Sequence, residues 1–198
     1  CSLVGSEMCI RDRCDTIIAQ FAADVLETPI DNISVYGVDT DISPYDSGSY
    51  ASSTTYLTGM AAVKACEQLR ERIIALAAVR MNKDASALTF DGENVIDESD
   101  GAKMSLFDIA TASMCNNEIS LEVTYSHSSP VSPPPFMAAC AEIEADPETG
   151  AIELLDYTAC VDCGTVVNTN LARVQTEGGL LQGIGMTPVS YTHLRAHE

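Results

Sequence analysis

The chain has 198 residues, 46% of them hydrophobic, which suits one domain or a piece of a larger protein. A net charge of −19 excludes nucleic acid and an acidic membrane surface as partners. No apolar run approaches the roughly 18 residues that a membrane-spanning helix needs.

The two ends of the chain differ from the rest. Residues 1–13 and 187–198 resemble translated sequencing-adapter sequence, and the first residues lack the features of a signal peptide. We therefore expect the native part to comprise residues 14–186. His193 and His197 have a spacing that can bind a metal ion on a helix, but they lie in the second tail.

The first half of the native part combines helical periodicity with turn signals. In chain order we predict a helix over residues 15–27 stopped by Pro29, a strand over 33–38, a helix over about 59–80, a hairpin over 88–96 with Asp91-Gly92 as its two-residue turn, and a short helix capped by Ser105. Asp108, three residues after Ser105, supports that cap.

The second half is more strand-like. We predict a strand over 118–125, an irregular Ser/Pro loop over 127–135, an antiparallel hairpin of strands 139–145 and 151–161 with a turn over 146–150, and a helical pattern over 175–185. In the first hairpin strand, Ala139, Ala141, Ile143 and Ala145 are expected to point inward. Glu142 and Glu144 could form a catalytic carboxylate pair, but a charged outer face is the simpler interpretation. The fold class is mixed α/β (α+β).

The stretch 39–58 is the centre of the functional interpretation. Residues 39–48 carry the Asp, Ser, Pro and Gly of turns, and residues 49–58 are small and hydroxylated. Such a loop before a helix can bind an anion through backbone N–H groups and hydroxyls, or it can be a polar loop with helix caps. An EF-hand is excluded because its sixth and twelfth positions hold Pro44 and Tyr50.

The helical pattern over 175–185 is unusually rich in glycine. Each glycine costs about 1 kcal/mol relative to Ala in a helix, so the close approach of another backbone or a ligand is expected there. Gln175, at the start of its glycine-rich part, could direct its amide toward a ligand or be an exposed helical residue.

Six cysteines remain in the native part, mostly in apolar surroundings, which is typical of buried, reduced thiols in a cytoplasmic protein. Cys160-Val-Asp-Cys163 could be a redox pair or half of a zinc site. It has no second pair, and two unlinked thiols near a strand end are the favoured interpretation.

Five segments in register resemble one known family. They are residues 15–26, Asp39 to Ser52, Ala141 to Gly150, Asp162 to Asn168, and Gln175 to Gly185. Together they resemble the molybdenum-binding large subunit of the xanthine dehydrogenase/aldehyde oxidase family. The sequence of the second segment is most similar to that of bacterial xanthine dehydrogenases. The fold is then a partial molybdopterin-binding domain, with antiparallel hairpins packed against long helices.

The resemblance implies a cofactor and partners. It implies a molybdenum atom held by a pyranopterin, in its plain or cytosine dinucleotide form, so no protein residue is expected to ligate the metal. Members hydroxylate purines, aldehydes or N-heterocycles with oxygen from water. Electrons then pass through Fe–S clusters to FAD on partner subunits or domains.

The resemblance also implies site residues. Ala51 matches a backbone contact near the molybdenum centre, and Gln175 matches a glutamine near the pterin. Ser49, Ser52 and Thr54 match hydroxyl positions near the pterin and its phosphates. The family's Gly-Gln-Gly before Asp15 and its catalytic glutamate are missing, so no catalytic residue is predicted and the chain is expected to be inactive alone.

Two alternatives remain open from the residues themselves. One is a non-catalytic acidic binding module, in which the Ser/Gly loop is only a linker and the glycine-rich helix has no explanation. The other is a thiol redox protein that uses Cys160 and Cys163.

Overall fold

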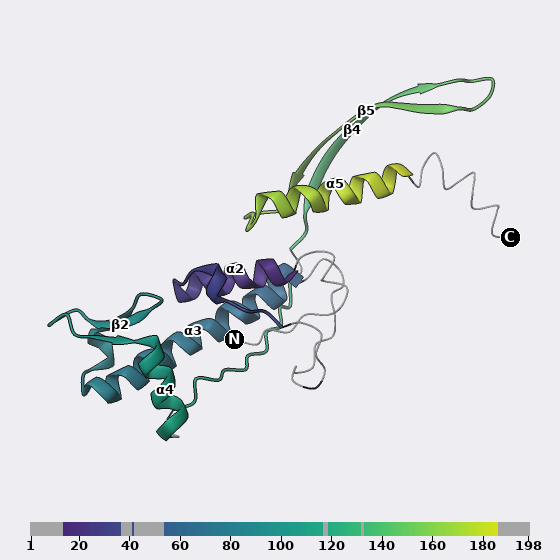
Figure 1. Ribbon diagram of the computed structural model, residues 1–198. Helices are drawn as coiled ribbons and strands as arrows, with labels where there is room; N and C mark the ends of the chain where they lie inside the picture. Colours follow the sequence, from purple (N-terminus) through teal and green to yellow (C-terminus); the bar gives the residue numbers. More distant parts are fainter. Residues whose placement is uncertain (1–13, 37–40, 42–53, 117–118, 132, 186–198) are drawn as a thin grey trace. The chain divides into compact units, whose positions relative to one another are not determined.

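A computed structural model describes residues 14–36, 41, 54–116, 119–131 and 133–185 (Figure 1). The chain divides into two compact units, residues 1–130 and 131–198. Each unit combines helices with antiparallel strands, which confirms the predicted mixed α/β class.

Two helices form the frame of the first unit, α2 (Cys14–Leu26) and α3 (Thr54–Met81), which pack along one another (Figure 1). Helix α2 ends with Glu27 in the left-handed conformation (φ 53°), and the Thr28 amide donates to the Ala23 carbonyl over 3.1 Å. This is the hydrogen bond of a Schellman cap. The predicted first helix is therefore confirmed, and the short 3-10 helix η1 (Ile30–Asn32) follows it.

A small antiparallel sheet of order β1-β2-β3 completes the first unit with helix α4. Its elements are η2 (Ala85–Ala87), β1 (Leu88–Phe90), β2 (Asn94–Asp97), β3 (Lys103–Ser105) and α4 (Leu106–Asn116). The Asp108 amide donates to Ser105 Oγ over 3.1 Å, and Ser105 Oγ donates to the Asp108 carboxylate over 2.7 Å, so the predicted cap is confirmed.

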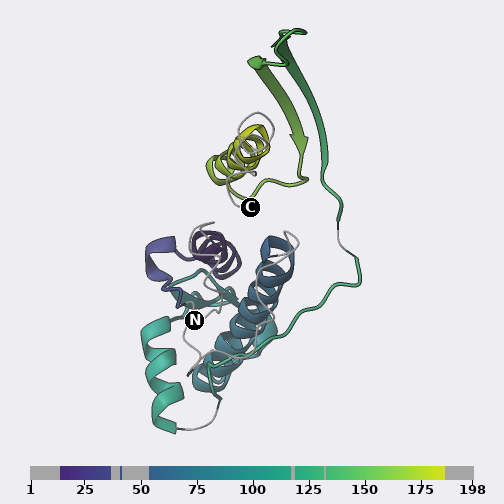
Figure 2. The ribbon, with the colours of Figure 1, turned by 90° about the vertical axis from the view of Figure 1, so that its right-hand side faces the viewer.

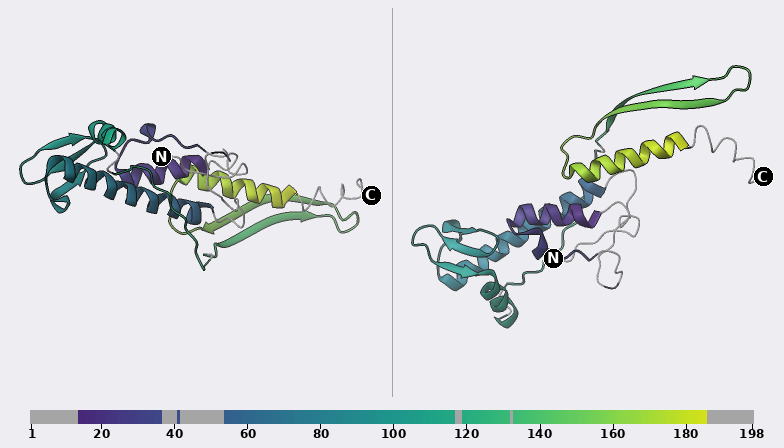
Figure 3. Two further views of the ribbon diagram at one scale, coloured as in Figure 1. Left: turned by 90° about the horizontal axis from the view of Figure 1, so that it is seen from below. Right: turned by 45° about the horizontal axis from the view of Figure 1, so that its top comes forward.

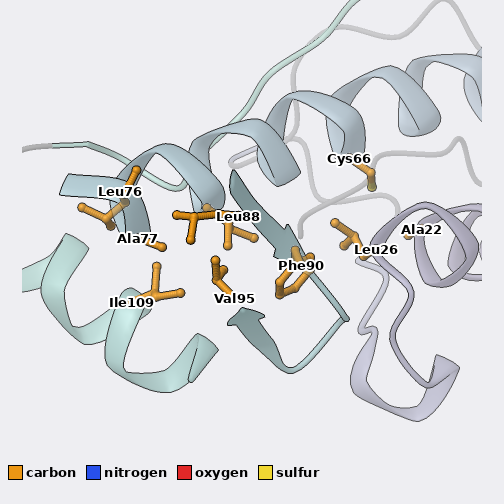
Figure 4. Packing of buried hydrophobic residues seen from close by; sticks show 11 residues of the cluster. Ala22, Leu26, Cys66, Leu76, Ala77, Leu88, Phe90, Val95 and Ile109 are labelled. Carbon is orange, nitrogen blue, oxygen red and sulfur yellow. The ribbon is translucent and has the colours of Figure 1, made fainter. Parts of the chain in front are cut away.

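The core of the first unit joins both helices to the sheet. Figure 4 shows Leu26 of α2, Leu76 of α3, Phe90 of β1, Val95 of β2 and Ile109 of α4 pointing into one cluster. Leu76, Val95 and Ile109 are 0% exposed. This burial is the main source of stability in the unit, since fully burying such a side chain contributes about 1.5–3 kcal/mol.

Ion pairs connect the segment that follows α3 to the end of the central strand β2. Asp97, only 1% exposed, lies at the end of β2 and accepts from Ser99, while Lys83 Nζ stands 2.8 Å from its other oxygen. Lys83 also pairs with Asp100 at 2.5 Å. These partners hold the pKa of the Asp97 carboxyl far below its usual range and raise the pKa of Lys83 to about 12.

Four predictions about elements of the first unit need correction. Helix α3 begins at Thr54, not near Gly59, because Thr and Tyr are tolerated in a helix that tertiary packing stabilises. Three residues, Asp91 to Glu93, separate β1 from β2, not two. Residues 33–36 and 119–125 do not form strands. In the second of these segments, the Ser120 carbonyl accepts a hydrogen bond from the Arg72 side chain of α3 over 3.2 Å.

The second unit consists of one long hairpin and one helix (Figure 3). Strands β4 (Phe136–Ala145) and β5 (Ile152–Asp162) pair antiparallel, and helix α5 (Thr169–Gly185) follows. The turn between the strands is confirmed: Asp146 accepts from the Glu148 amide over 2.9 Å, and Gly150 has φ +73°. Asn168 caps α5 by accepting from the Leu171 amide over 3.0 Å.

None of the described residues of the second unit is buried. All ten residues of β4 are exposed, so Ala139, Ala141, Ile143 and Ala145 share one face of the strand but do not point into a core. Two predicted buried thiols, Cys14 and Cys66, are buried, while the other four cysteines are exposed. Cys115 lies on the exposed side of α4 in the first unit, whereas the hairpin that carries Cys140 and Cys160 has no layer packed over most of its length within the described residues.

Candidate functional site

The predicted cofactor residues fall in both units. Ser49, Ala51 and Ser52 lie outside the described residues. Thr54 is the first residue of α3 in the first unit, and Gln175 lies on α5 in the second. The two described residues are therefore considered separately, each within its own unit.

The beginning of α3 has the chemistry of an anion site. Its first turn contains Thr54 and Thr55 and no acidic residue. The earlier start of the helix places the Thr54 hydroxyl at the end of the helix where backbone N–H groups lack intrahelical acceptors. Those groups and the helix dipole favour negative charge at this end. Residues 49–53 precede this position in the sequence.

Helix α5 presents an exposed polar face that is built around glycine. Gln175, Gly178, Gly179 and Gln182 recur at i, i+3, i+4 and i+7, so they lie on one side of the helix, and all four are exposed. A Cβ atom added at Gly178 or Gly179 would meet nothing within 4 Å. The surface between the two glutamines is therefore flat and open, and a planar ligand or another backbone can come close to it.

Sequence reasoning selected Gln175 and noted the glycines, but it missed Gln182. The signal was available in the spacing, because residues seven apart in a helix face the same way. Each glutamine amide offers two N–H donors and one carbonyl acceptor. The face thus provides hydrogen-bonding groups at both ends of the glycine pair.

A different face of α5 lines a pocket of about 350 Å³ against β5. Ala159 and Val161 form its β5 wall, and Thr176 and Leu180 belong to its helix wall. Arg173 and Glu177, which also line it, form an exposed ion pair at 2.6 Å that raises the pKa of the arginine. The Thr176 hydroxyl donates to the Ala172 carbonyl over 2.9 Å, so it stabilises the helix. The pocket is thus mostly apolar.

The remaining candidates give no site in the described part of the chain. No group of three or more His, Cys, Asp or Glu side chains there is arranged to hold a metal ion. Cys160 and Cys163 are free, exposed thiols. Glu142 and Glu144 are exposed on the same side of β4, as expected for a charged outer face. No helix in those residues has the length and apolarity to cross a membrane.

Comparison with solved structures gives the class of protein. The structure matches the Cu,Mo-CO dehydrogenase with a TM-score of 0.71 and 28% identity, covering 83% of this chain and 21% of that one. Its helices and small antiparallel sheets are those of a fragment of a molybdopterin-binding domain.

The sequence comparisons give the family. A family model described as "Molybdopterin cofactor-binding domain" matches residues 14–191. The chain is 36% identical to "Probable hypoxanthine oxidase XdhD" of Escherichia coli K12 over 172 residues, covering 86% of the chain and 18% of that protein. It is 29% identical to "Xanthine dehydrogenase molybdenum-binding subunit" of Escherichia coli O157:H7 over 181 residues, covering 89% and 24%.

The chain therefore belongs to the family of molybdenum-binding subunits of xanthine dehydrogenases and aldehyde oxidases, as its motifs predicted. It spans about a fifth of the length of the relatives that it matches.

Proposed function

We propose that the chain is part of the large subunit of a molybdenum hydroxylase that oxidises a purine such as xanthine. In this proposal residues 14–186 bind the pyranopterin cofactor, in its plain or cytosine dinucleotide form. Electrons pass to partner subunits that carry Fe–S clusters and FAD, and the complex is cytoplasmic. Related N-heterocycles and aldehydes are the alternative substrates.

The observation that carries the proposal is the open face of α5. A helix interior rarely contains the two adjacent glycines Gly178 and Gly179, because each lowers helix stability by about 1 kcal/mol relative to Ala. Nothing in the described chain approaches them closely enough to explain that cost. A cofactor lying against the helix backbone explains it, and the glutamines on either side can then donate to its polar edge.

The residues of this chain would act by binding and orienting. The Ser49, Ser52 and Thr54 hydroxyls and the α3 N-terminus would hold the pterin and its phosphates, and the Ala51 backbone would contact the metal end. Gln175 would donate its amide to the pterin. When bound, the molybdenum centre supplies the two-electron redox chemistry of hydroxylation with water. The acidic chain thus needs few cations to hold an anionic cofactor.

Two features favour a purine over the other substrate classes. The amino-acid sequence of residues 39–52 is most similar to that of xanthine dehydrogenases, and two relatives carry purine-related names. Carbon monoxide dehydrogenases match this chain in sequence as well as in structure, but at lower identity than the two relatives with purine-related names. Substrate choice in the complete enzyme depends on residues beyond this chain, so it must be assayed.

The test begins with the source DNA read through both ends of the chain. We expect a Gly-Gln-Gly segment before Asp15 and a glutamate-containing segment of Gly-Glu-Pro type downstream. The complete subunit, expressed with its partners, should contain molybdenum and pterin and oxidise xanthine. A complete subunit that carries no pterin would contradict the proposal and leave a non-catalytic acidic binding module as the function.

The role of Gln175 is tested in the same complex. Gln175→Ala should lower the pterin content about three- to tenfold, because one hydrogen bond contributes about 0.5–1.5 kcal/mol net. The neighbouring Val174, which is 62% exposed, provides the control: Val174→Ala should leave the pterin content unchanged. Equal effects of both variants would remove Gln175 from the site.

A further inference from the structure

The β4–β5 hairpin has one apolar face along its whole length. On β4 this face carries the alternating residues from Met137 to Ala145, and on β5 their partners in the ladder. The pairs are Met137 with Val161, Ala139 with Ala159, Ala141 with Tyr157, Ile143 with Leu154, and Ala145 with Ile152. The opposite face carries acidic pairs, Glu142 with Asp156 and Glu144 with Glu153.

A β-bulge keeps this face apolar. The register shifts between Glu142 and Ile143, so that Glu142 pairs with Asp156 while Ile143 pairs with Leu154. Leu155 is thereby left as the extra residue of β5. Without the shift, Leu154 would fall on the acidic face, because a one-residue slip exchanges the faces of a strand. The register shift thus keeps the apolar surface continuous, although pairing of the two strands does not itself depend on an apolar surface.

Most of that surface is open within the described residues of the second unit. The pocket against α5 uses Ala159 and Val161, near the end of β5 that leads to the helix. Figure 2 shows the turn end of the hairpin extending beyond α5, and there Ile143 and Ile152 are 53% and 56% exposed. A two-stranded sheet alone is marginally stable in water, and opposed like charges weaken this one further.

We propose that the apolar face of the hairpin at Ile143, Ala145, Ile152 and Leu154 docks against an uncharged, apolar layer formed by another part of the same polypeptide. The inference depends on the proposed function in one respect, that the chain is a piece of a longer subunit. Since the chain spans about a fifth of its relatives' length, most of such a subunit is available to form the covering layer.

Charge argues against a second copy of this chain as the occupant. The hairpin, residues 136–162, contains seven Asp and Glu residues and no Lys or Arg. Two copies packed through the apolar face would keep their acidic faces outward, but each copy carries a net charge of −19, and the mutual repulsion of these net charges opposes their association. An uncharged apolar layer buries the isoleucines and leaves the acidic face in water.

The test compares two neighbouring residues on opposite faces. Ile152→Lys places a charge on the apolar face, and Glu153→Lys places the same side chain on the acidic face. In the complete subunit, Ile152→Lys should lower the Tm by about 5 °C or more, because it buries an unpaired charge, while Glu153→Lys should not lower it. In the 198-residue chain, both variants should keep the Tm within about 1 °C, since both sites are exposed there.

Each other outcome would overturn the inference. An unchanged Tm for Ile152→Lys in the complete subunit would show that no layer covers the face. Sedimentation showing dimers of the 198-residue chain that Ile152→Lys dissociates would assign the face to a second copy. Loss of only the Fe–S or FAD subunit would assign it to a partner. Pterin content is measured separately, so a subunit that lacks pterin but shows the expected Tm difference would refute the proposed function alone.

Discussion

The two units of this chain differ in how far they bury their hydrophobic side chains. The first, residues 14–130, encloses a core from α2, α3, α4 and a three-stranded sheet, and its largest core side chains are fully buried. The second, from residue 131, has a longer hairpin and a full helix, yet none of its described residues is buried. Regular secondary structure therefore does not imply a core, since the described residues of the second unit form none among themselves.

The largest expected effect is at Gly92, where the hairpin tip meets the end of α2. Gly92 has φ +91°, and a Cβ atom there would lie 2.0 Å from the Glu27 carbonyl oxygen. Gly92→Ala should cost about 4 kcal/mol or more in the free energy of unfolding, because neither backbone can move without separating sheet from helix.

The control for Gly92 is Gly101, which has φ +72° but nothing within 4 Å of an added Cβ. Gly101→Ala should cost only the conformational penalty, about 1 kcal/mol. Urea unfolding of both variants measures the difference. Equal costs would mean that the contact between the hairpin tip and α2 contributes nothing.

A truncation in each unit tests the contrast directly. Leu76→Ala should cost about 3 kcal/mol, since the site is 0% exposed and loses both transfer energy and packing. Leu155→Ala, at a site that is 53% exposed, should stay within about 0.5 kcal/mol. Chemical denaturation followed by circular dichroism gives both values. A large cost at Leu155 would show that the second unit has a core of its own.

The ion pair at Asp97 should make the first unit sensitive to pH. The pKa of Asp97 is lower in the folded than in the unfolded state, so its stabilising contribution is complete above about pH 5 and is lost as the pH falls below about 4. The pKa of Lys83 is raised to about 12, so its contribution is present below about pH 10 and lost above it.

Asp97→Asn should therefore lower the Tm at pH 7 by about 5 °C and flatten the pH dependence below pH 5. Asp108→Asn, at the exposed cap of α4, is a control that removes a carboxylate without removing this pair. Scanning calorimetry from pH 3 to pH 8 measures both. A variant with the same acid sensitivity as the wild type would show that other carboxylates dominate.

The last comparison makes the same substitution in one helix of each unit. Gly59→Ala in α3 would bring a Cβ to 2.5 Å from the Phe21 ring of α2, and overpacking of this kind costs about 1–3 kcal/mol. Gly178→Ala in α5 meets nothing and should stabilise the isolated chain by up to about 1 kcal/mol through helix propensity.

In the complete, cofactor-loaded subunit the substitution at Gly178 should be unfavourable, in contrast to its stabilising effect on the isolated chain. Gly178→Ala should then lower the pterin content, because the added methyl group stands on the face proposed for the cofactor. Unfolding of the isolated chain and pterin analysis of the complex are the two measurements. Unchanged pterin content would leave the glycine face without a role in binding.

The sequence alone determined most of the local structure and the family. The α2 periodicity, the Ser105 cap, the Asp146 turn and the β4–β5 hairpin are local signals, and local hydrogen bonds confirm each of them. The motifs spread over residues 14–186 identified the family, which the match over residues 14–191 confirms. The roles of Ser49, Ala51, Ser52, Thr54 and Gln175 stay predictions.

Only the tertiary structure decided what depends on distant partners. Residues 33–36 and 119–125 have strand-like sequences but pair with no strand among the described residues. Helix α3 begins as early as Thr54 because tertiary packing outweighs the weak helix propensity of its first residues. Alternation predicted a buried face on β4, but burial requires a second layer, and none of the described residues supplies one beyond α5. The bulge at Leu155 likewise depends on the register in which the two strands pair.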